Sequence, residues 1–340
     1  MRAAAALAGL AGLAGLVGVA GCGGGGGAPA DAAVDAAAGP VVVDVTASAP
    51  TRLSSYRLFT WDPQAGFTWN AGVLPYDLNT PLFSDYALKQ RAIYVPPGAA
   101  ATYDPEEPFA FPVGAVVVKN FAFPADLRAP TVDVHLIETR LLVRYPDGWH
   151  PLPYIWDADQ RDAVLSPAGE VRTIAFIDAT GAPQQASYLI PERNQCQSCH
   201  ARKPDATAPL ETVLIGVKAR HLNRAYDYGA GVGVQNQLAR LTAVGALTGA
   251  PDPAGVAAAT DFRPIEAGGV GGLTGAALDA AARSYLDINC AHCHNPAGVQ
   301  GMTSQLFLDH ATTDPFHLGV CKRPGSAGIG SQFPTDDQAE

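Results

Sequence analysis

The sequence predicts an α+β protein in which a β-rich N-terminal domain is followed by a mainly α-helical region. Residues 41–191 are rich in aromatic and β-branched side chains and in Pro and Gly, a composition that favours short strands joined by turns. Further along the chain, apolar residues recur at helical spacing in residues 233–247 and again from Thr274 onward. These two patterns divide the chain into a strand-forming part and a helix-forming part.

Length and charge set the broad limits. A chain of 340 residues is long enough for about two or three domains. The formal net charge of −10 argues against nucleic acid as a partner and favours partner proteins that present basic patches.

The N-terminus has the layout of an export signal. Arg2 is followed by an apolar run that ends at Cys22, and residues 19–22 read Val-Ala-Gly-Cys, which resembles the lipobox of bacterial lipoproteins. Residues 1–22 are therefore predicted to be a lipoprotein signal peptide, with Cys22 as the acylated membrane anchor. An uncleaved membrane helix is the alternative, because the run approaches the ~20 residues that span a bilayer. We expect an exported, membrane-anchored protein in the periplasm or at the cell surface, with the glycine-rich residues 23–40 as a flexible tether.

The β-rich domain is predicted over residues 41–191, and its clearest element is a hairpin. In residues 134–145 apolar side chains alternate with a largely charged set, Glu138, Arg140 and Arg144, which predicts a strand with one side in water. Pro-Asp-Gly at 146–148 then turns the chain into a second strand at 149–156. Further strands are expected at 113–123, 171–178 and 187–190.

Two short segments repeat the pattern C-x-x-C-H. The first contains Cys196, Cys199 and His200, and the second contains Cys290, Cys293 and His294. In this pattern both thiols form thioethers with the vinyl groups of haem, and the adjacent histidine ligates the iron from one side. The sequence therefore predicts two covalently attached haem c groups, with His200 and His294 as the proximal iron ligands.

The cysteines allow two other interpretations. A C-x-x-C pair can be a redox disulfide, and two pairs can hold zinc. Zinc ribbons usually separate their pairs by about 15 to 20 residues, whereas these motifs begin 94 residues apart, at positions 196 and 290. Neither reading explains why a histidine follows the second cysteine in both motifs.

The haem-bearing part divides into a first segment at 192–250, a linker at 251–272 and a second segment at 273–340. A helix over about 233–247 is expected to cover one haem face in the first segment. In the second segment a helix that begins near Thr274 leads into Cys290. Its apolar face is formed by Leu278, Ala282, Tyr285 and either Ile288 or Asn289. This arrangement resembles the class I cytochrome c fold, in which an N-terminal helix runs into the haem motif.

Several residues are candidates for the second axial ligand of each iron. His221, 21 residues after His200, is a candidate distal ligand for the first haem. Class I cytochromes commonly use a methionine well downstream of the motif, and here Met302 follows His294 by only eight residues. The remaining options for the second haem are an open position, a group from elsewhere, or one of three downstream residues, His310, His317 and Cys321. His135 and His150 of the β-rich domain are further distal candidates.

Taken together, the chain resembles an uncharacterised bacterial family of dihaem c-type cytochromes with a β-rich N-terminal region. The resemblance covers about residues 51–323 and rests on both haem motifs and on three other blocks, at 81–86, 111–114 and 137–144. It implies haem binding and electron transfer. Members of the family extend further at the C-terminus with a methionine-proline segment; this chain departs after Arg323, so we expect the second haem segment to be incomplete there.

The expected function is single-electron transfer in the bacterial cell envelope, with redox proteins as partners. One alternative is a haem-dependent oxidoreductase, a peroxidase or substrate dehydrogenase with an open haem site. Another is an envelope binding module whose β-rich domain docks a redox partner. Electron transfer is favoured over enzymatic turnover, because the 94-residue spacing of the motifs is short for the dihaem peroxidases. In the β-rich domain, no paired spacing singles out a catalytic acid and base.

Overall fold

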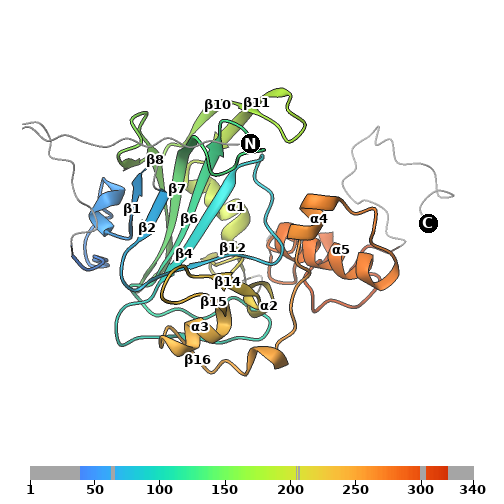
Figure 1. The fold of residues 1–340 in the computed structure, drawn as a ribbon. Coiled ribbons are helices and arrows are strands. Elements are labelled where there is room, and N and C mark those ends of the chain that lie inside the picture. The colour runs from blue at the N-terminus through green and yellow to red at the C-terminus, as the bar shows by residue number, and fades with distance from the viewer. Residues whose placement is uncertain (1–38, 63–65, 204, 206, 299–303, 321–340) are drawn as a thin grey trace, which may run out of the picture. The chain divides into compact units, whose positions relative to one another are not determined.

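A six-stranded antiparallel sheet forms the centre of the computed structural model, which describes residues 39–62, 66–203, 205, 207–298 and 304–320. Its strand order is β3-β4-β6-β7-β8-β9, and β4, β6 and β7 lie side by side in Figure 1. The strands are β3 (Val73–Tyr76), β4 (Leu88–Tyr94), β6 (Val116–Pro124), β7 (Val134–Tyr145), β8 (Gly148–Trp156) and β9 (Ala163–Leu165). The predicted hairpin is confirmed as β7 and β8, and β6 matches the strand expected at 113–123.

The remaining strands form two-stranded pairs. The antiparallel pairs are β1 (Phe59–Asp62) with β2 (Gly66–Trp69), β10 (Glu170–Ile177) with β11 (Pro183–Ile190), β12 (Ala201–Arg202) with β13 (Glu211–Thr212), and β14 (Ala225–Asp227) with β15 (Val234–Asn236). The fifth pair is parallel and joins β16 (Leu247–Thr248) to β5 (Ala101–Thr102), so it connects two segments that the sequence placed in different domains.

The predicted helical region is the main error of the sequence analysis. Strand accounts for 32% of the structure and helix for only 17%, and no predominantly helical, cytochrome c-like region is present among the described residues. The α-helices in this part of the chain are α1 (Gln197–His200), α2 (Ala219–Leu222), α3 (Gln237–Ala243), α4 (Arg263–Gly268) and α5 (Gly275–Asn289). Three 3-10 turns, Leu53–Tyr56, Arg193–Cys196 and Pro253–Gly255, complete the described elements.

The helix predicted at 233–247 is reduced to α3. Asn236 caps its start, because the Asn236 side chain accepts hydrogen bonds from the backbone of Leu238 and Ala239. Gly245, at a φ of 76°, lies in the left-handed region and follows the end of the helix. Leu247 beyond it pairs with Ala101 rather than extending the helix.

Helix α5 begins where predicted, with Thr274 at its N-cap position, but its buried face is only partly the predicted one. Ile288 is buried as expected, whereas Leu278 and Tyr285 are exposed and Ser284 and Asp287 are buried instead. A polar residue can replace an apolar one at a buried position when its charge or hydroxyl is paired, and Asp287 is paired as described below.

The sheet separates two sets of core side chains. On one face, Val118, Leu141 and Tyr154 pack with Leu53 and Tyr56 of the N-terminal segment. We call the other side the motif face, because the chain that carries both C-x-x-C-H motifs covers it. Its side chains contribute to two apolar clusters, one that contains Ile93, Val117 and Leu142 and one that contains Phe121 and Ile155.

Because other segments cover the motif face, the expectation that one side of β7 faces water is wrong. Its charged set was expected in water, yet the Glu138 side chain is fully buried, and Tyr188 of β11 donates a hydrogen bond to it at 2.7 Å. The same packing joins the β-rich segment and the segments that carry the two motifs in one core, since Tyr76 and Phe109 cluster with Leu238 and Ile288. The described residues all belong to one compact unit that spans residues 35–340.

Several predicted features lie outside the described residues. These are Cys22, the signal peptide at 1–22, most of the tether at 23–40, Met302 and Cys321. Within the described ranges, no helix is long and apolar enough to cross a membrane.

Candidate functional site

The first motif occupies a helical turn above the sheet. The 3-10 turn Arg193–Cys196 runs directly into α1, and a reciprocal pair of hydrogen bonds between Glu192 and Gln195 caps its start. Residues three apart on a helix point to the same side, so this turn places Cys196 and Cys199 on one face with His200 immediately after them. That is the arrangement that two thioether bonds and one adjacent imidazole ligand require.

His200 is held in a single tautomer by the backbone. Its Nδ1 lies 2.8 Å from the carbonyl oxygen of Val213, which can only accept, so Nδ1 carries the proton and donates it. The backbone N–H of Val213 in turn donates to the carbonyl of His200 at 2.7 Å. The Nε2 lone pair has no hydrogen-bond partner among the described residues and is available to a metal. Burial lowers the pKa of His200 to about 4, so the ring is neutral at physiological pH.

The second motif follows α5 and forms a turn of its own. The backbone N–H groups of Cys293 and His294 both donate to the carbonyl of Cys290, at 3.1 and 2.9 Å. Cys290 and Cys293 are therefore also three residues apart on one helical turn. The His294 ring differs from that of His200, because its Nδ1 is buried with no hydrogen-bond partner in the described part of the chain.

The two motifs contact each other although 94 residues separate them. The Cys293 thiol lies 3.1 Å from the carbonyl oxygen of Ser198, inside the first motif. Just beyond the motifs, the backbone N–H of Lys203 donates to the carbonyl of Ala297 at 2.8 Å. Burial raises the pKa of the Cys293 thiol, and the neighbouring Cys199 raises it further. The fold therefore brings the two predicted haem sites together.

The four motif cysteines are free thiols in this structure, not disulfides. The described ranges contain no group of three or more His, Cys, Asp or Glu side chains placed to hold a metal ion. Free thiols in pairs on two helical turns, each followed by a histidine, fit covalent attachment of haem. The free Nε2 of His200 fits an iron ligand, since metal-bound histidines usually donate their other ring N–H to a carbonyl or carboxylate.

His221 of α2, the candidate distal ligand of the first haem, lies in a buried ion cluster around Asp287 of α5. Its Nε2 is 2.8 Å from the Asp287 carboxylate, which also pairs with Arg220 at 2.9 Å and Lys218 at 3.6 Å. Burial lowers the pKa of His221, so the ring is neutral and donates from Nε2. Burial alone would raise the pKa of Asp287, but the hydrogen bond from His221 and the two cations hold it well below its usual range. His221 Nδ1 has no partner among the described residues.

The other candidate histidines lie at or near the surface. His135 and His150 pair with Asp133 at 3.1 Å and with Asp147 at 2.9 Å. His317 stacks on Phe307, with ring centroids 4.3 Å apart, and its Nδ1 donates to the carbonyl of Gln305. His310 lines a cavity, as described next.

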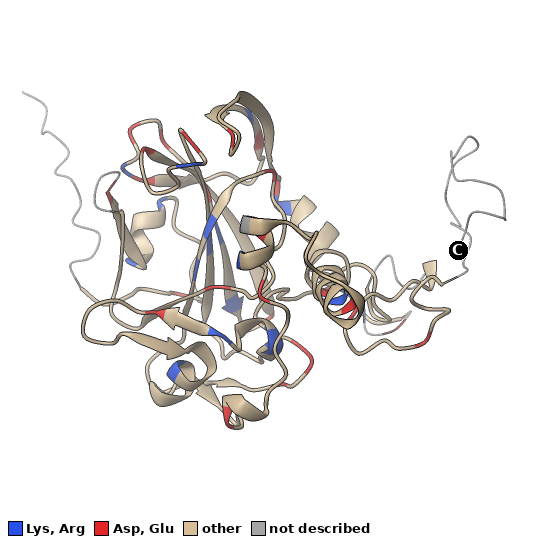
Figure 2. Ribbon diagram, turned by 45° about the vertical axis from the view of Figure 1, so that its right-hand side comes forward, with Lys and Arg blue, Asp and Glu red and all other residues tan. Residues whose placement is uncertain are grey.

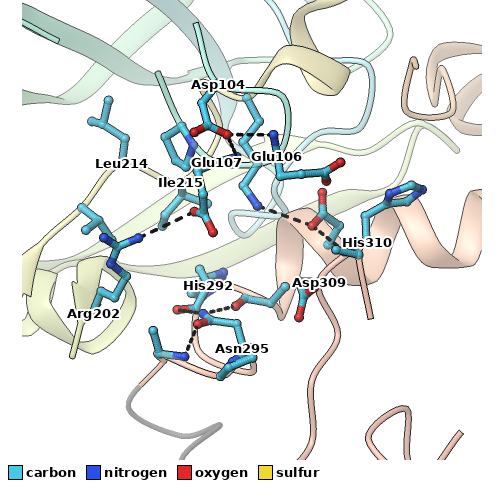
Figure 3. A pocket seen from close by; sticks show the side chains of 18 of the residues that line it. Asp104, Glu106, Glu107, Arg202, Leu214, Ile215, His292, Asn295, Asp309 and His310 are labelled. Atoms are coloured by element: carbon cyan, nitrogen blue, oxygen red, sulfur yellow. Dashed lines mark hydrogen bonds and ion pairs between the residues drawn. The ribbon is translucent and has the colours of Figure 1, made fainter. Parts of the chain in front are cut away.

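A cavity of about 540 Å³ opens between the second motif and the β-rich part of the chain. Figure 3 shows Asp104, Glu106 and Glu107 on one side of it and His292 and Asn295 on the other. The second-motif residues in its lining are Ala291, His292 and Asn295; the lining does not include Cys290, Cys293 or His294. The cavity therefore lies on the other side of this turn from the residues predicted to hold haem.

Comparisons with known proteins identify no relative: no protein-family model, no curated protein and no solved structure matches the chain. The resemblance to a dihaem cytochrome family thus remains an expectation from the motifs and blocks quoted above.

Sequence reasoning missed three features of the site. Val213 has no polar side chain, and its role comes entirely from its backbone. From the sequence alone, Asp287 is a typical solvent-facing residue of a helix. Only the fold shows that Lys218, Arg220 and His221 surround it. The third feature is a row of three cations on the motif face, formed by Arg91, Lys119 and Arg140 on neighbouring strands; Figure 2 shows basic positions on these central strands.

Proposed function

We propose that the protein is a dihaem c-type cytochrome that transfers single electrons in the bacterial cell envelope. Cys196 and Cys199 would attach the first haem and Cys290 and Cys293 the second, with His200 and His294 as proximal ligands. The haem groups supply the redox chemistry, one electron per iron. The fold that carries them is β-rich and unlike the class I cytochrome c fold.

The observation that carries this proposal is the hydrogen bond from His200 Nδ1 to Val213. It fixes the ring orientation and leaves Nε2 as the free lone pair, while burial keeps the imidazole neutral. A disulfide between Cys196 and Cys199 would not require this histidine to be so prepared. The test is the absorption spectrum of the reduced, matured protein, which should show the sharp bands of a c-type cytochrome; a spectrum without them refutes the proposal.

The contact between the motifs supports electron transfer in particular. Cys293 touches the first motif at Ser198, so groups attached to the two turns would be neighbours. Neighbouring redox centres exchange electrons readily, and two such centres suit a protein that accepts an electron at one haem and releases it at the other. The acidic net charge favours a partner protein with a basic docking patch.

Carbon monoxide binding and peroxide turnover distinguish an electron-transfer protein from a haem oxidoreductase. An oxidoreductase needs an open iron position, so the reduced protein should bind carbon monoxide stoichiometrically and turn over peroxide or another donor. The electron-transfer proposal expects neither at a significant rate. The cavity beside the second motif does not favour the enzyme, because its lining excludes Cys290, Cys293 and His294.

The envelope location has its own test. We propose that Cys22 is acylated after signal cleavage and anchors the protein to a membrane. Labelled palmitate should enter the wild type and be absent from Cys22→Ala. Equal labelling of the two proteins would rule out this anchor while leaving the haem proposal intact.

A further inference from the structure

The cavity beside the second motif is lined by three cationic side chains of the described residues, Arg202, Lys218 and Arg220. Its volume of about 540 Å³ lies within the range of small-molecule sites, about 300–1,000 Å³. The proposed electron transfer gives none of these cations a role. Their partners therefore show whether the cavity has a binding chemistry of its own.

Arg220 is buried with most of its hydrogen-bonding capacity unused. The residue is only 6% exposed. A guanidinium carries N–H donors on all of its nitrogens. In Arg220, Nη1 donates to Asp287 at 2.9 Å, whereas Nε is buried without a partner in the described part of the chain. Buried polar groups are nearly always hydrogen-bonded, so these unused donors indicate an acceptor that the protein itself does not supply.

The ion cluster around Asp287 carries one positive charge in excess. Lys218 and Arg220 share the single Asp287 carboxylate, at 3.6 and 2.9 Å, and His221 is neutral as described above. The side chains of Lys218 and Arg220 are only 16% and 7% exposed. A positive charge in excess is costly at a buried place, and an anion in the adjoining cavity would neutralise it.

The other carboxylates of the lining do not satisfy these cations. Asp104 accepts hydrogen bonds from two backbone N–H groups of its own loop, at 2.9 and 2.7 Å. Asp309 accepts from the backbone N–H and the hydroxyl of Thr312. Glu107 lies 3.9 Å from Arg202, beyond hydrogen-bond distance, and the Arg202 Nε is buried without a partner among the described residues. Unused donors thus remain on two arginines of the same cavity.

The lining also has an apolar part and an acidic rim. Phe109, Trp149 and Ile215 contribute apolar surface to the cavity. Glu106 and Glu107 are exposed, and Figure 3 shows them with Asp104 on the side away from the second motif. Their negative charges disfavour a second anionic group on a ligand. The cavity therefore suits a molecule with an apolar body and one negative charge.

We propose that this cavity binds a small organic acid, with its carboxylate at Lys218 and Arg220 and its apolar body against Phe109, Trp149 and Ile215. Hydrogen bonds between a guanidinium or ammonium and a carboxylate are charge-assisted and strong, so the cations orient the ligand. The proposal goes beyond the proposed function and does not rest on it, because none of these residues is assigned to haem.

The test is isothermal titration calorimetry of the full-length, haem-loaded protein with three probes. Benzoate has the carboxylate and an apolar ring, benzamide has the same shape without the charge, and inorganic phosphate has the charge without the ring. We expect benzoate to bind at a single site. Benzamide and phosphate should each bind at least about tenfold more weakly, a difference of about 1.4 kcal/mol or more.

Three variants assign the binding to the cations. Lys218→Met removes the excess charge while Arg220 and His221 still pair with Asp287, so we expect benzoate affinity to fall about tenfold. Lys218→Arg keeps the charge and should bind nearly as well as the wild type. Arg128→Met removes a charge that is 55% exposed and does not line the cavity, and is the control. Should Lys218→Met fail to fold, Arg202→Met carries the same expectation.

Four results would overturn the proposal: no binding of benzoate, equal affinities for benzoate and benzamide, tighter binding of phosphate than of benzoate, and wild-type affinity for benzoate in Lys218→Met. The first excludes the ligand class, the second the role of the cations, the third the apolar body and the fourth the assigned residue. A protein that binds benzoate but carries no covalent haem would refute the proposed function and support this site, so the two proposals fail separately.

Discussion

The Nδ1 atom of His200 donates a hydrogen bond of 2.8 Å to the carbonyl oxygen of Val213, and the N–H of Val213 returns one of 2.7 Å to the carbonyl of His200. This reciprocal pair joins the end of the first C-x-x-C-H motif to the start of the chain that leads to the second. It orients the imidazole before any iron is present, so that little reorganisation is needed when a metal binds at Nε2.

Removing this imidazole should open one iron. In His200→Gly the proposed thioethers at Cys196 and Cys199 would remain, so we expect two haems per chain but a loss of low-spin character at one of them. Added imidazole should restore the low-spin spectrum, because it refills the position that the side chain vacated. His150→Gly removes a partly exposed histidine elsewhere and is the control. A His200→Gly spectrum identical to wild type would exclude His200 as a ligand.

The buried Asp287 cluster should be a large contributor to stability. Asp287→Asn leaves Lys218 and Arg220 near a neutral amide in a buried site, and breaking such a pair costs about 3–5 kcal/mol. Asp279→Asn, at an exposed position of the same helix, should change the free energy of unfolding by less than about 0.5 kcal/mol. Urea unfolding of both variants measures the difference. Similar values for the two would show that the cluster is not a stabilising unit.

His221 makes the stability depend on pH in a defined direction. Its pKa in the folded protein is lower than its ordinary value of about 6.5. As pH falls through about 6.5, the unfolded chain therefore binds a proton that the folded protein does not, and stability decreases until the pH reaches the lowered pKa. His292, whose pKa burial also lowers, acts in the same direction, while Asp287 stays ionised.

The corresponding measurement is the urea midpoint at pH 7.5 and at about pH 5, where each such histidine contributes up to about 1.4 kcal/mol per pH unit. His221→Gln should show a smaller decrease between the two values than the wild type. His135→Gln, which alters an exposed side chain, should retain the full decrease. Equal decreases in all three proteins would contradict the assignment.

Gly298 is the glycine on which the second motif most depends. A Cβ there would lie 2.3 Å from the carbonyl oxygen of Cys293 and 2.8 Å from the Asn295 amide. Gly298→Ala must displace backbone of the motif itself, so we expect a loss of about 1–3 kcal/mol and less haem at the second site. At Gly255 an added Cβ meets nothing within 4 Å, and Gly255→Ala is the matched control. Wild-type stability and haem content in Gly298→Ala would show that this turn tolerates the shift.

The sequence predicted those parts of the fold that depend on local pattern. The alternation in residues 134–145 and the Pro-Asp-Gly turn after it were sufficient to predict the β7–β8 hairpin. Thr274 similarly predicted the start of α5. Both signals act over a few residues, where side-chain spacing and turn chemistry decide the backbone conformation.

The errors come from long-range packing. The apolar spacing of Leu238, Leu241 and Leu247 suggested one helix, but Leu247 pairs with Ala101 from a distant segment. Leu278 and Tyr285 were expected inside and are exposed, because the opposite side of α5 buries Asp287 against cations that no local pattern reveals. In the candidate site, sequence spacing indicated the motif residues, whereas the contact between Cys293 and Ser198 exists only in the fold.

Intact mass spectrometry of the matured protein tests the central claim most directly. The wild type should carry the mass of two covalently bound haems. Cys196→Ala/Cys199→Ala and Cys290→Ala/Cys293→Ala should each carry one, and the two combined should carry none. A wild-type mass equal to that of the polypeptide alone, after expression with a functional haem-attachment system, would contradict the account.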